Sequence, residues 1–448
     1  MATLLPIQAI RYNPDKINGP LASVVAPPYD VISLEDQDNL HKKSPHNVIR
    51  LILNRQYDGD GPGDNRYTRA AKTLHDWLDE QILLEDERPA YFVYEQTFEI
   101  SAGTGSRTRK LVRRGVLGAL RLEPFGQGCV FPHEETFSAP KADRLSLVRE
   151  CRANLSAVFG LIPDGDGSMV ALLERAVAKA RPGAEVLEES GVLNRLWALD
   201  NAAFGASLAG LLAQRKVFIA DGHHRYETAC AYRDERRKGD SNPGLKRERA
   251  YDSVLMMCVP MNDPGLNILP THRVVQAGPA FTSAQLLQKS AELFEREPAD
   301  ERRLVALSEE ESGALKFGVV FAGGEKAVLT AKPGVETAMA RLAEGKSPAW
   351  RGLDVAVLHE LILKGMLGIG TNGAAHNGTG HKQGILYTKD SGEVFSLVDK
   401  SGTYNLGFIL RPTRIDQVQA VAEKGDKMPH KSTYFYPKLL SGLVMRRL

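Results

Sequence analysis

The chain has little cysteine, and the few cysteines that it has are far apart. Its four cysteines, Cys129, Cys151, Cys230 and Cys258, form no CxxC pair, so their spacing supports neither a structural zinc site nor a dithiol redox motif. Isolated cysteines of this kind are typical of a reducing compartment, where the side chain acts as a small buried hydrophobe.

The sequence also lacks an excess of charge and any long apolar run. A formal net charge of +2 over 448 residues is far from the basic excess of a dedicated nucleic-acid binder, so we expect no nucleic-acid partner and a local site for any anion. No apolar run approaches the ~20 residues that span a bilayer, and the first residues lack the basic and apolar parts of a signal peptide. We therefore expect a cytoplasmic protein with no membrane partner.

What the sequence does contain is an ordinary globular composition, with 43% hydrophobic and 25% charged residues, and short helical and strand patterns. Apolar spacing predicts helices over 34–42 (after an N-cap at Ser33), 67–82, 141–154, 169–180, 226–237, 283–296 and 355–366. It predicts strands over 48–53, 91–98, 109–115, 216–220, 253–260, 317–321, 326–330, 384–387 and 407–410. Because this order has no regular βαβ rhythm, we predict an α+β fold with a mixed sheet.

We divide the chain into three regions on this pattern. Residues 1–160 form an N-terminal α+β region, and residues 161–282 form a central region around the motif ADGHHRYETA. Residues 283–448 form an accessory α+β region, whose basic tail we expect to pack back on the core.

The segment VFIADGHHRY, residues 217–226, predicts an anion-binding turn. An apolar strand ends at Ala220, a turn follows, and a helix then begins. The first N–H groups of a helix lack partners, and its dipole favours anions at that end. Cations at this end are costly unless an anion binds there, which indicates a phosphate site. The residues concerned are the turn residues Asp221 and Gly222 and the cations His223, His224 and Arg225.

This turn has two other interpretations. One is a capping aspartate followed by core histidines, but consecutive residues of a helix point to different faces, so packing buries at most one of them. The other is metal binding by His223 and His224, but adjacent histidines seldom chelate one ion, and no HxxxH spacing is present.

Two further motifs carry carboxylates. In FPHEET, residues 131–136, His133 stands beside Glu134 after a proline and could supply a general base or a magnesium ligand. The alternative is a surface loop with an acid at a helix start. In APPYD, residues 26–30, two prolines make a rigid platform for Tyr29 and Asp30, with a structural turn as the alternative.

Two basic motifs lie further along the chain. His272 and Arg273 follow the predicted strand 253–260 after a short loop, so they could reach the same side of the sheet as the turn, although a lone His-Arg pair is usually surface. Near the C-terminus, residues 427–438 combine lysines with aromatic residues. We expect this run to dock on the body, and Lys431, Ser432 and Thr433 to close over a phosphate; the alternative is a solvated basic face.

Familiar nucleotide motifs are missing. The chain has no Walker A loop and no GxSxG elbow. Residues 368–373 match GxGxxG as a string, but they follow a helix rather than a strand, so the dinucleotide interpretation fails on context.

The motifs together resemble a known family. ADGHHRYETA, with APPYDVIS, FPHEET, ANLS, ILPTHR and MPHKSTYFYPKLLSGLV, is similar to the bacterial and archaeal domain of unknown function 1015. These motifs are spread over nearly the whole chain. The family name itself implies no activity.

The strand followed by DGHHR and a helix is also similar to the central turn of free serine kinases, which belong to the ParB/sulfiredoxin-like superfamily. That resemblance implies a ParB/sulfiredoxin-like core with additional α/β layers, and donor phosphates held on Gly222 to Arg225. It also implies that Asp221 helps to hold magnesium or the acceptor, and that an N-terminal carboxylate acts as base, with Asp30 and Glu134 as the candidates.

We therefore predict a phosphotransferase that uses Mg²⁺ to move a phosphoryl group from ADP, ATP or pyrophosphate to a small hydroxylated metabolite, L-serine first among them. A non-catalytic nucleotide-binding regulator and a metal-dependent phosphohydrolase are the alternatives, and a homodimer is possible. The predicted roles are catalytic for Asp30, Glu134, Asp221 and His223; phosphate-binding for Gly222, His223, His224, Arg225, His272, Arg273, Lys431, Ser432 and Thr433; substrate-binding for Tyr29, His133, Thr136 and Tyr226; and metal-binding for Asp221 and Glu134.

Overall fold

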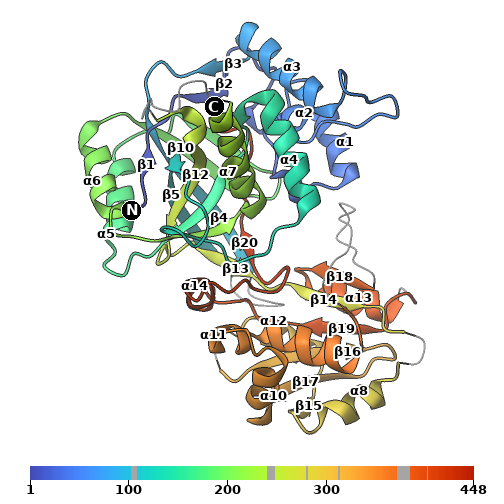
Figure 1. Ribbon diagram of the computed structural model, residues 1–448. Helices are drawn as coiled ribbons and strands as arrows, with labels where there is room; N and C mark the ends of the chain where they lie inside the picture. Colours follow the sequence, from blue (N-terminus) through green and yellow to red (C-terminus); the bar gives the residue numbers. More distant parts are fainter. Residues whose placement is uncertain (102–107, 240–247, 279–280, 311–312, 371–383, 401) are drawn as a thin grey trace.

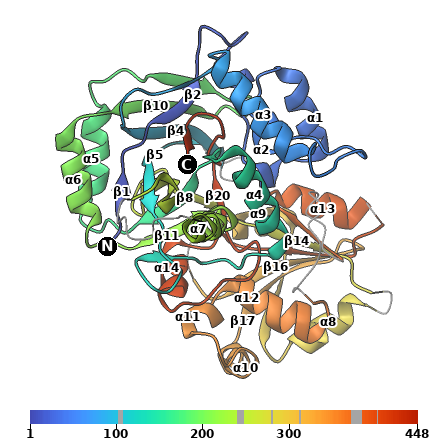
Figure 2. The same ribbon diagram turned by 45° about the horizontal axis from the view of Figure 1, so that its top comes forward.

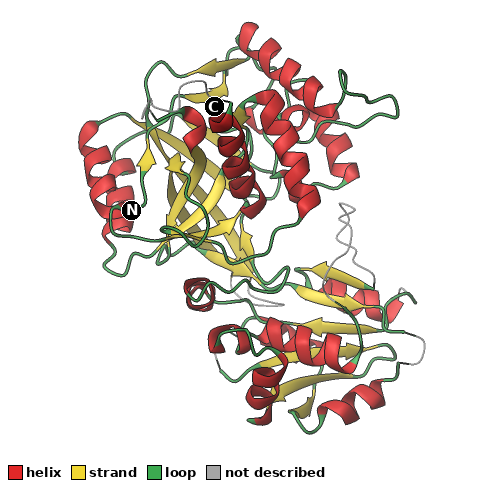
Figure 3. Cartoon of the chain, in the orientation of Figure 1, coloured by secondary structure: helices red, strands yellow, loops and turns green. Residues whose placement is uncertain are grey.

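Two lobes, each built around its own β-sheet, make up the chain (Figure 1). This computed structural model describes residues 1–448 except 102–107, 240–247, 279–280, 311–312, 371–383 and 401. Helices cover the strands of both lobes (Figure 3), and the larger sheet contains parallel and antiparallel pairs. The predicted α+β class with a mixed sheet and additional layers is therefore confirmed.

The larger lobe is organised by a nine-stranded sheet. In spatial order its strands are β6 (Val130–Phe131), β11 (Val217–Asp221), β8 (Val158–Ile162), β12 (Ser253–Pro260), β5 (Thr108–Arg121), β4 (Tyr91–Ser101), β10 (Leu193–Leu199) and β9 (Ala184–Leu187), while β1 (Leu4–Leu5) pairs with β5. The predicted hairpin of β4 and β5 is confirmed, with Tyr94 opposite Gly115; most of its predicted tip lies outside the described residues.

Both faces of the central strands are buried, which explains their continuous apolar sequences. Alternate residues point to opposite faces: Val217 and Ile219 join one core, and Phe218 and Ala220 join another. The first core includes residues of α5 (Ser168–Val177), α6 (Ala202–Leu212) and α7 (His223–Lys238). The second includes the C-terminal residues Phe435, Leu439, Leu440 and Val444.

The N-terminal part of the larger lobe adds a helical corner. It contains α1 (Leu34–Lys43), α2 (Ile49–Ile52), α3 (Arg66–Asp79), α4 (Ser138–Cys151) and a four-stranded sheet in the order β3 (Leu83–Glu85), β2 (Ala9–Tyr12), β21 (Met445–Arg447) and β7 (Ala153–Asn154). Ser33 caps α1 through a capping box, as predicted.

The strand predicted over 48–53 is wrong, because this segment forms the short helix α2. The Asn47 side chain accepts a hydrogen bond from the Ile49 N–H at 2.9 Å, and so satisfies a donor of the first turn. Ile49, Leu51 and Ile52 are all buried, so tertiary packing has overridden the strand preference of this apolar run.

The smaller lobe holds a six-stranded antiparallel sheet. Its order is β15 (Phe294–Pro298), β17 (Lys326–Ala331), β16 (Lys316–Phe321), β19 (Leu406–Ile409), β14 (His272–Val275) and β18 (Ile385–Thr388). Residues of α9 (Glu301–Ser308) and α13 (Ser391–Lys400) pack on one face. The other elements are α8 (Ser283–Ser290), α10 (Gly334–Leu342), α11 (Pro348–Arg351), α12 (Asp354–Val357), the π-helix Leu358–Met366 and α14 (Ile415–Glu423).

The hairpin predicted from 317 to 330 is confirmed by β16 and β17. The helix predicted over 283–296 ends early, because residues 294–298 pair with β17 as an edge strand. The second half of the GxGxxG string, residues 371–373, lies outside the described residues.

Residues 427–438, which we call the C-terminal segment, join the two lobes. Within it, β20 (Tyr434–Tyr436) pairs with β13 (Asn267–Leu269) at the junction (Figure 1). The buried Arg113 of β5 donates a hydrogen bond to the Tyr436 carbonyl at 3.3 Å. The segment therefore passes from the smaller lobe onto the large sheet, beside α7 and β11 (Figure 2).

The predicted division into three regions stays a proposal. In the structure the large sheet takes strands from both sides of residue 160.

Candidate functional site

The site is built on the turn between β11 and α7, where the sequence predicted an anion. β11 ends at Asp221, and Gly222 has φ 87° and ψ 29° before α7 begins at His223. This left-handed conformation favours glycine. A Cβ on Gly222 would lie 2.9 Å from the Arg225 Nε, so both the backbone and the neighbouring side chain require glycine here.

Two cations hold the carboxylate of Asp221. The Arg225 Nη2 lies 2.9 Å from one oxygen, and the Lys438 Nζ lies 3.1 Å from the other. Arg225 also donates to the Ala157 carbonyl. Burial alone would raise the pKa of Asp221, but Lys438 and Arg225 lower it below its ordinary value. Asp221 is thus an ionised anchor for the two cations, and this pairing occupies both of its oxygens.

Sequence reasoning assigned no role to Lys438. It lies 217 positions from Asp221, and its ammonium sits 4.5 Å from the centre of the Tyr434 ring. The available signal was its place immediately before the apolar run at Leu439, because a lysine at the start of a buried run needs a partner for its charge.

His133 and His223 form a buried pair on the inner side of the turn. Their rings lie 4.7 Å apart and almost perpendicular, at 80°, and each side chain is at most 3% exposed. The His133 Nδ1 faces the Ile219 carbonyl at 2.7 Å, so it carries the proton and Nε2 accepts from the Thr433 hydroxyl at 3.0 Å. Burial lowers the pKa of His133, and it lowers that of His223 to about 3.

The His223 Nε2 accepts the His133 backbone N–H at 3.3 Å. Neutral His223 therefore carries its proton on Nδ1, which faces the Glu134 Oε2 at 3.7 Å. The two neutral histidines thus fix the FPHEET loop against β11, His133 by donating to the Ile219 carbonyl and His223 by accepting the His133 N–H.

Glu134 is the partly exposed acid of this cluster. Its side chain is 31% exposed, and its other oxygen lies 3.4 Å from the His430 Nδ1. The Met428 N–H donates to the His133 carbonyl at 2.7 Å, which ties the loop to the C-terminal segment. Burial alone would raise the pKa of Glu134, but His430 and His223 hold it well below its ordinary value.

His224 and Thr136 lie on the outer side of the turn. The His224 Nε2 accepts the Phe137 N–H at 2.9 Å, which leaves Nδ1 as the protonated nitrogen. Thr136 donates to Glu227, whose carboxylate also pairs with Lys141 at 2.9 Å.

Tyr29 and Asp30 approach the turn from the N-terminal corner. The Arg144 guanidinium lies 4.0 Å from the centre of the Tyr29 ring, and burial raises the pKa of Tyr29 to about 12. Asp30 is exposed. Against the effect of burial, the charges of Asp221 and Asp30 raise the pKa of Lys438, whereas burial lowers the pKa of His224 despite the opposing charges of Glu134 and Asp30. Asp30 therefore belongs to the rim of the site.

Tyr226, His272 and Arg273, which were predicted as site residues, are buried in other contacts. Tyr226 is fully buried; its hydroxyl donates to the Glu123 carbonyl at 2.8 Å, and its ring stacks on Phe125. His272 and Arg273 begin β14 in the smaller lobe, and each is 1% exposed. After β12 the chain continues through β13 into β14, which belongs to the sheet of the smaller lobe. It does not return to the turn between β11 and α7.

Residues 431–433 contact different lobes. Thr433 donates to His133, as described, while the Ser432 carbonyl accepts from Thr413 at 2.8 Å. The Lys431 carbonyl accepts from Arg273 at 3.0 Å, and Lys431 has φ 57°. Of the three, Thr433 is the one that the structure places against the histidine pair.

The carboxylates of the site do not form a preorganised magnesium site. Within the described ranges, no group of three or more His, Cys, Asp or Glu side chains is placed to hold a metal ion. Asp221 is neutralised by two cations and Glu134 faces two histidines.

Across the described residues, no helix has both the length and the apolar character needed to cross a membrane.

The solved structures that resemble this chain include free serine kinases, the group that the DGHHR turn resembles in sequence. A free serine kinase variant in complex with AMP is 12% identical, with a TM-score of 0.32, covering 68% of this chain and 84% of that chain. A conserved hypothetical protein from Pyrococcus furiosus is 12% identical, with a TM-score of 0.30 and coverages of 69% and 89%. SbnI from Staphylococcus aureus, truncated at its C-terminus, is 10% identical, with a TM-score of 0.31 and coverages of 73% and 86%.

No curated protein matches the chain. A family model does match it: the family described as "Protein of unknown function (DUF1015)" covers residues 4–356, which is most of the chain and includes the DGHHR turn. The chain belongs to the DUF1015 family.

Proposed function

We propose that this protein is a phosphotransferase that moves a phosphoryl group from ADP, ATP or pyrophosphate to a small hydroxylated acceptor. The observation that carries the proposal is the position of Glu134. Its carboxylate is partly exposed beside the first turn of α7, faces His223 and His430, and has no Lys or Arg ion pair among the described residues. A carboxylate held in this way is suited to align a hydroxyl group and accept its proton.

The donor phosphates would bind at the N-terminus of α7. The first turn of that helix presents N–H groups without intrahelical acceptors, and its dipole favours negative charge. Lys438 and Arg225 both pair with the carboxylate of Asp221, so two cations lie at this turn, and a phosphate could pair with either of them. The Arg225 Nε is buried and has no hydrogen-bond partner in the described part of the chain, and it is a further donor at this turn.

The proposed reaction needs few groups from the protein. The acceptor oxygen forms a bond to the terminal phosphorus, the bond from that phosphorus to the bridging oxygen breaks, and the hydroxyl proton passes to Glu134. Positioning and charge neutralisation supply most of the rate in such transfers. Magnesium enters with the donor phosphates, since Mg²⁺ is commonly bound through one or two carboxylates plus substrate phosphates, and no step here depends on a metal already held by the protein.

L-serine is the first acceptor to test, because the DGHHR turn resembles that of free serine kinases in sequence. The experiment compares Glu134→Gln with Glu135→Gln, its exposed neighbour, as the matched control. Formation of phosphoserine is followed by mass with Mg²⁺ and each donor in turn. We expect Glu134→Gln to lower turnover by about 10²–10⁴-fold, the usual contribution of a positioned base, and Glu135→Gln to leave it unchanged.

Equal turnover by the two variants would remove Glu134 from the mechanism. Donor binding without any phosphorylated product would favour a regulatory nucleotide-binding protein instead. Release of inorganic phosphate from phosphoserine would favour a phosphohydrolase.

A further inference from the structure

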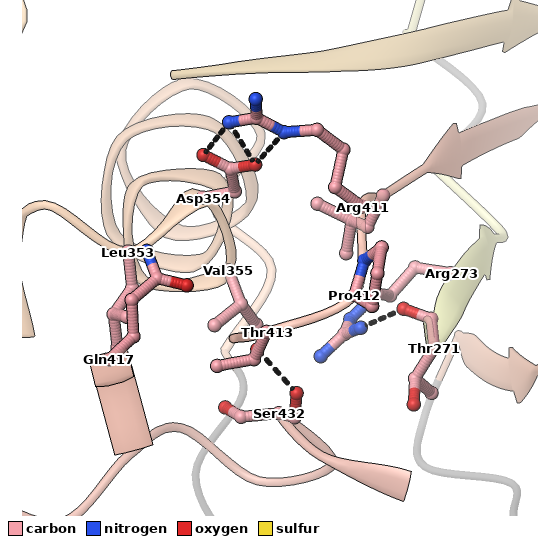
Figure 4. A pocket seen from close by; sticks show the side chains of 11 residues that line it. Thr271, Arg273, Leu353, Asp354, Val355, Arg411, Pro412, Thr413, Gln417 and Ser432 are labelled. Carbon is pink, nitrogen blue, oxygen red and sulfur yellow. Dashed lines mark hydrogen bonds and ion pairs between the residues drawn. The ribbon is translucent and has the colours of Figure 1, made fainter. Parts of the chain in front are cut away.

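A polar pocket lies in the smaller lobe, and Ser432 of the C-terminal segment is among its lining residues. The cavity itself has a volume of about 20 Å³, and the wider space of about 300 Å³ around it includes open solvent. Thr271, Arg273, Asp354, Arg411 and Thr413 are among the residues that line it (Figure 4). None of these side chains takes part in the site on α7.

The charges that line this pocket do not balance. Arg411 binds Asp354 through two hydrogen bonds, of 2.7 and 2.9 Å, so these two neutralise each other (Figure 4). Arg273 is 1% exposed, and no carboxylate pairs with it among the described residues. The pocket therefore carries one uncompensated positive charge, which is costly to bury without an anion.

The hydrogen bonds of Arg273 do not supply that anion. Its Nη1 donates to the Thr271 carbonyl, its Nη2 to the Lys431 carbonyl at 3.0 Å, and its Nε to the His359 Nε2 at 3.3 Å. Its Nη2 also donates to the His430 carbonyl at 3.4 Å, and all four acceptors are neutral groups. Burial accordingly lowers the pKa of Arg273 to about 10.

A second polar group of the pocket lacks a partner. Thr271 is 7% exposed, and its hydroxyl oxygen is buried with no hydrogen bond in the described part of the chain. Buried hydroxyl groups normally have partners, and an unpaired one points to a missing ligand or water. It stands two residues from Arg273, in the same wall of the pocket.

We propose that this pocket is a second ligand site, which binds the oxyanion of a small metabolite, a carboxylate or a phosphate. Arg273 supplies the charge, and the Thr271 hydroxyl donates a hydrogen bond to the anion. This site is independent of the phosphotransferase activity proposed for α7.

Calorimetric titration with two probes, inorganic phosphate and succinate, tests the proposal and distinguishes the two kinds of oxyanion. The Arg225→Ala variant serves as the parent protein, so that anion binding at the α7 turn does not obscure the result. We expect one equivalent of phosphate or of succinate to bind. In this parent, Thr271→Val should weaken that binding about tenfold, as expected for the loss of a hydrogen bond to a charged group.

Thr73→Val on α3 is the matched control, since its hydroxyl bonds the Arg69 carbonyl within that helix, and it should leave the affinity within twofold. Because the Thr271 hydroxyl has no protein partner, Thr271→Val should also melt no lower than its parent. Absence of binding of both probes at 10 mM, or binding that Thr271→Val leaves unchanged, would overturn the proposal.

Discussion

Replacing Gly222 by alanine tests whether the turn at the start of α7 has the geometry described here. Alanine at φ 87° pays roughly 1–2 kcal/mol for the left-handed backbone. Its Cβ would also lie 2.9–3.0 Å from the Nε, Cζ and Nη2 atoms of Arg225, and so would displace a guanidinium that is bound to Asp221 and to the Ala157 carbonyl.

Displacement of Arg225 loses hydrogen bonds that involve charged groups, each worth about 1.5–3 kcal/mol. Part of this loss is offset because Lys438 still neutralises Asp221. We therefore expect Gly222→Ala to lower the free energy of unfolding by about 2–4 kcal/mol. Gly239, at the other end of the same helix, is the control: its φ is −86° and the nearest atom to an added Cβ is at 3.7 Å.

Urea unfolding of both variants measures the difference, with tryptophan fluorescence as the probe. Trp77 and Trp197 lie in the larger lobe and Trp350 in the smaller, so most of the signal reports the lobe that holds the turn. Gly239→Ala should change stability by less than about 1 kcal/mol. If the two variants unfold within 0.5 kcal/mol of each other, the reasoning about the turn is refuted.

Two further predictions concern ionisable groups. The double-mutant cycle of Lys438→Met and Asp221→Asn should give a coupling energy of about 1–2 kcal/mol. This value lies between the energies typical of surface ion pairs and of buried ion pairs. A coupling energy near zero would show that the ion pair is not formed. Burial lowers the pKa of His272 to about 3. This imidazole therefore binds a proton more readily in the unfolded protein than in the folded protein. The free energy of unfolding should accordingly fall as the pH drops from about 6.5 towards 3. His272→Gln should reduce that slope by up to ~1.4 kcal/mol per pH unit, as measured by unfolding at pH 4 to 7, and an unchanged slope would contradict the assignment.

The features of the site that depend on residues close together in the sequence could be predicted from the sequence alone. The strand, the turn at Asp221 and Gly222, and the histidines at the start of α7 all lie within residues 217–224, so local rules are sufficient. The same is true of the Ser33 cap and of the hairpins. The approach of the C-terminal segment was also expected, from the apolar run after Lys438.

The remaining features depend on contacts between distant parts of the chain. The pairing of Lys438 with Asp221 joins residues 217 positions apart in the sequence and leaves no periodic signal. Tyr226 follows the turn directly, but the helix rotates its side chain into the core. His272 and Arg273 start a strand of the second sheet, and sequence alone does not say which sheet a strand joins.

The most direct test of the central claim is the product formed from L-serine. The wild-type protein is incubated with L-serine, Mg²⁺ and, separately, ADP, ATP or pyrophosphate, and the mixture is followed by mass and by ³¹P spectroscopy. A phosphotransferase should form phosphoserine in step with the loss of one donor. An unchanged acceptor with every donor, at protein concentrations that saturate donor binding, would contradict serine phosphorylation by the site at Glu134 and the α7 turn.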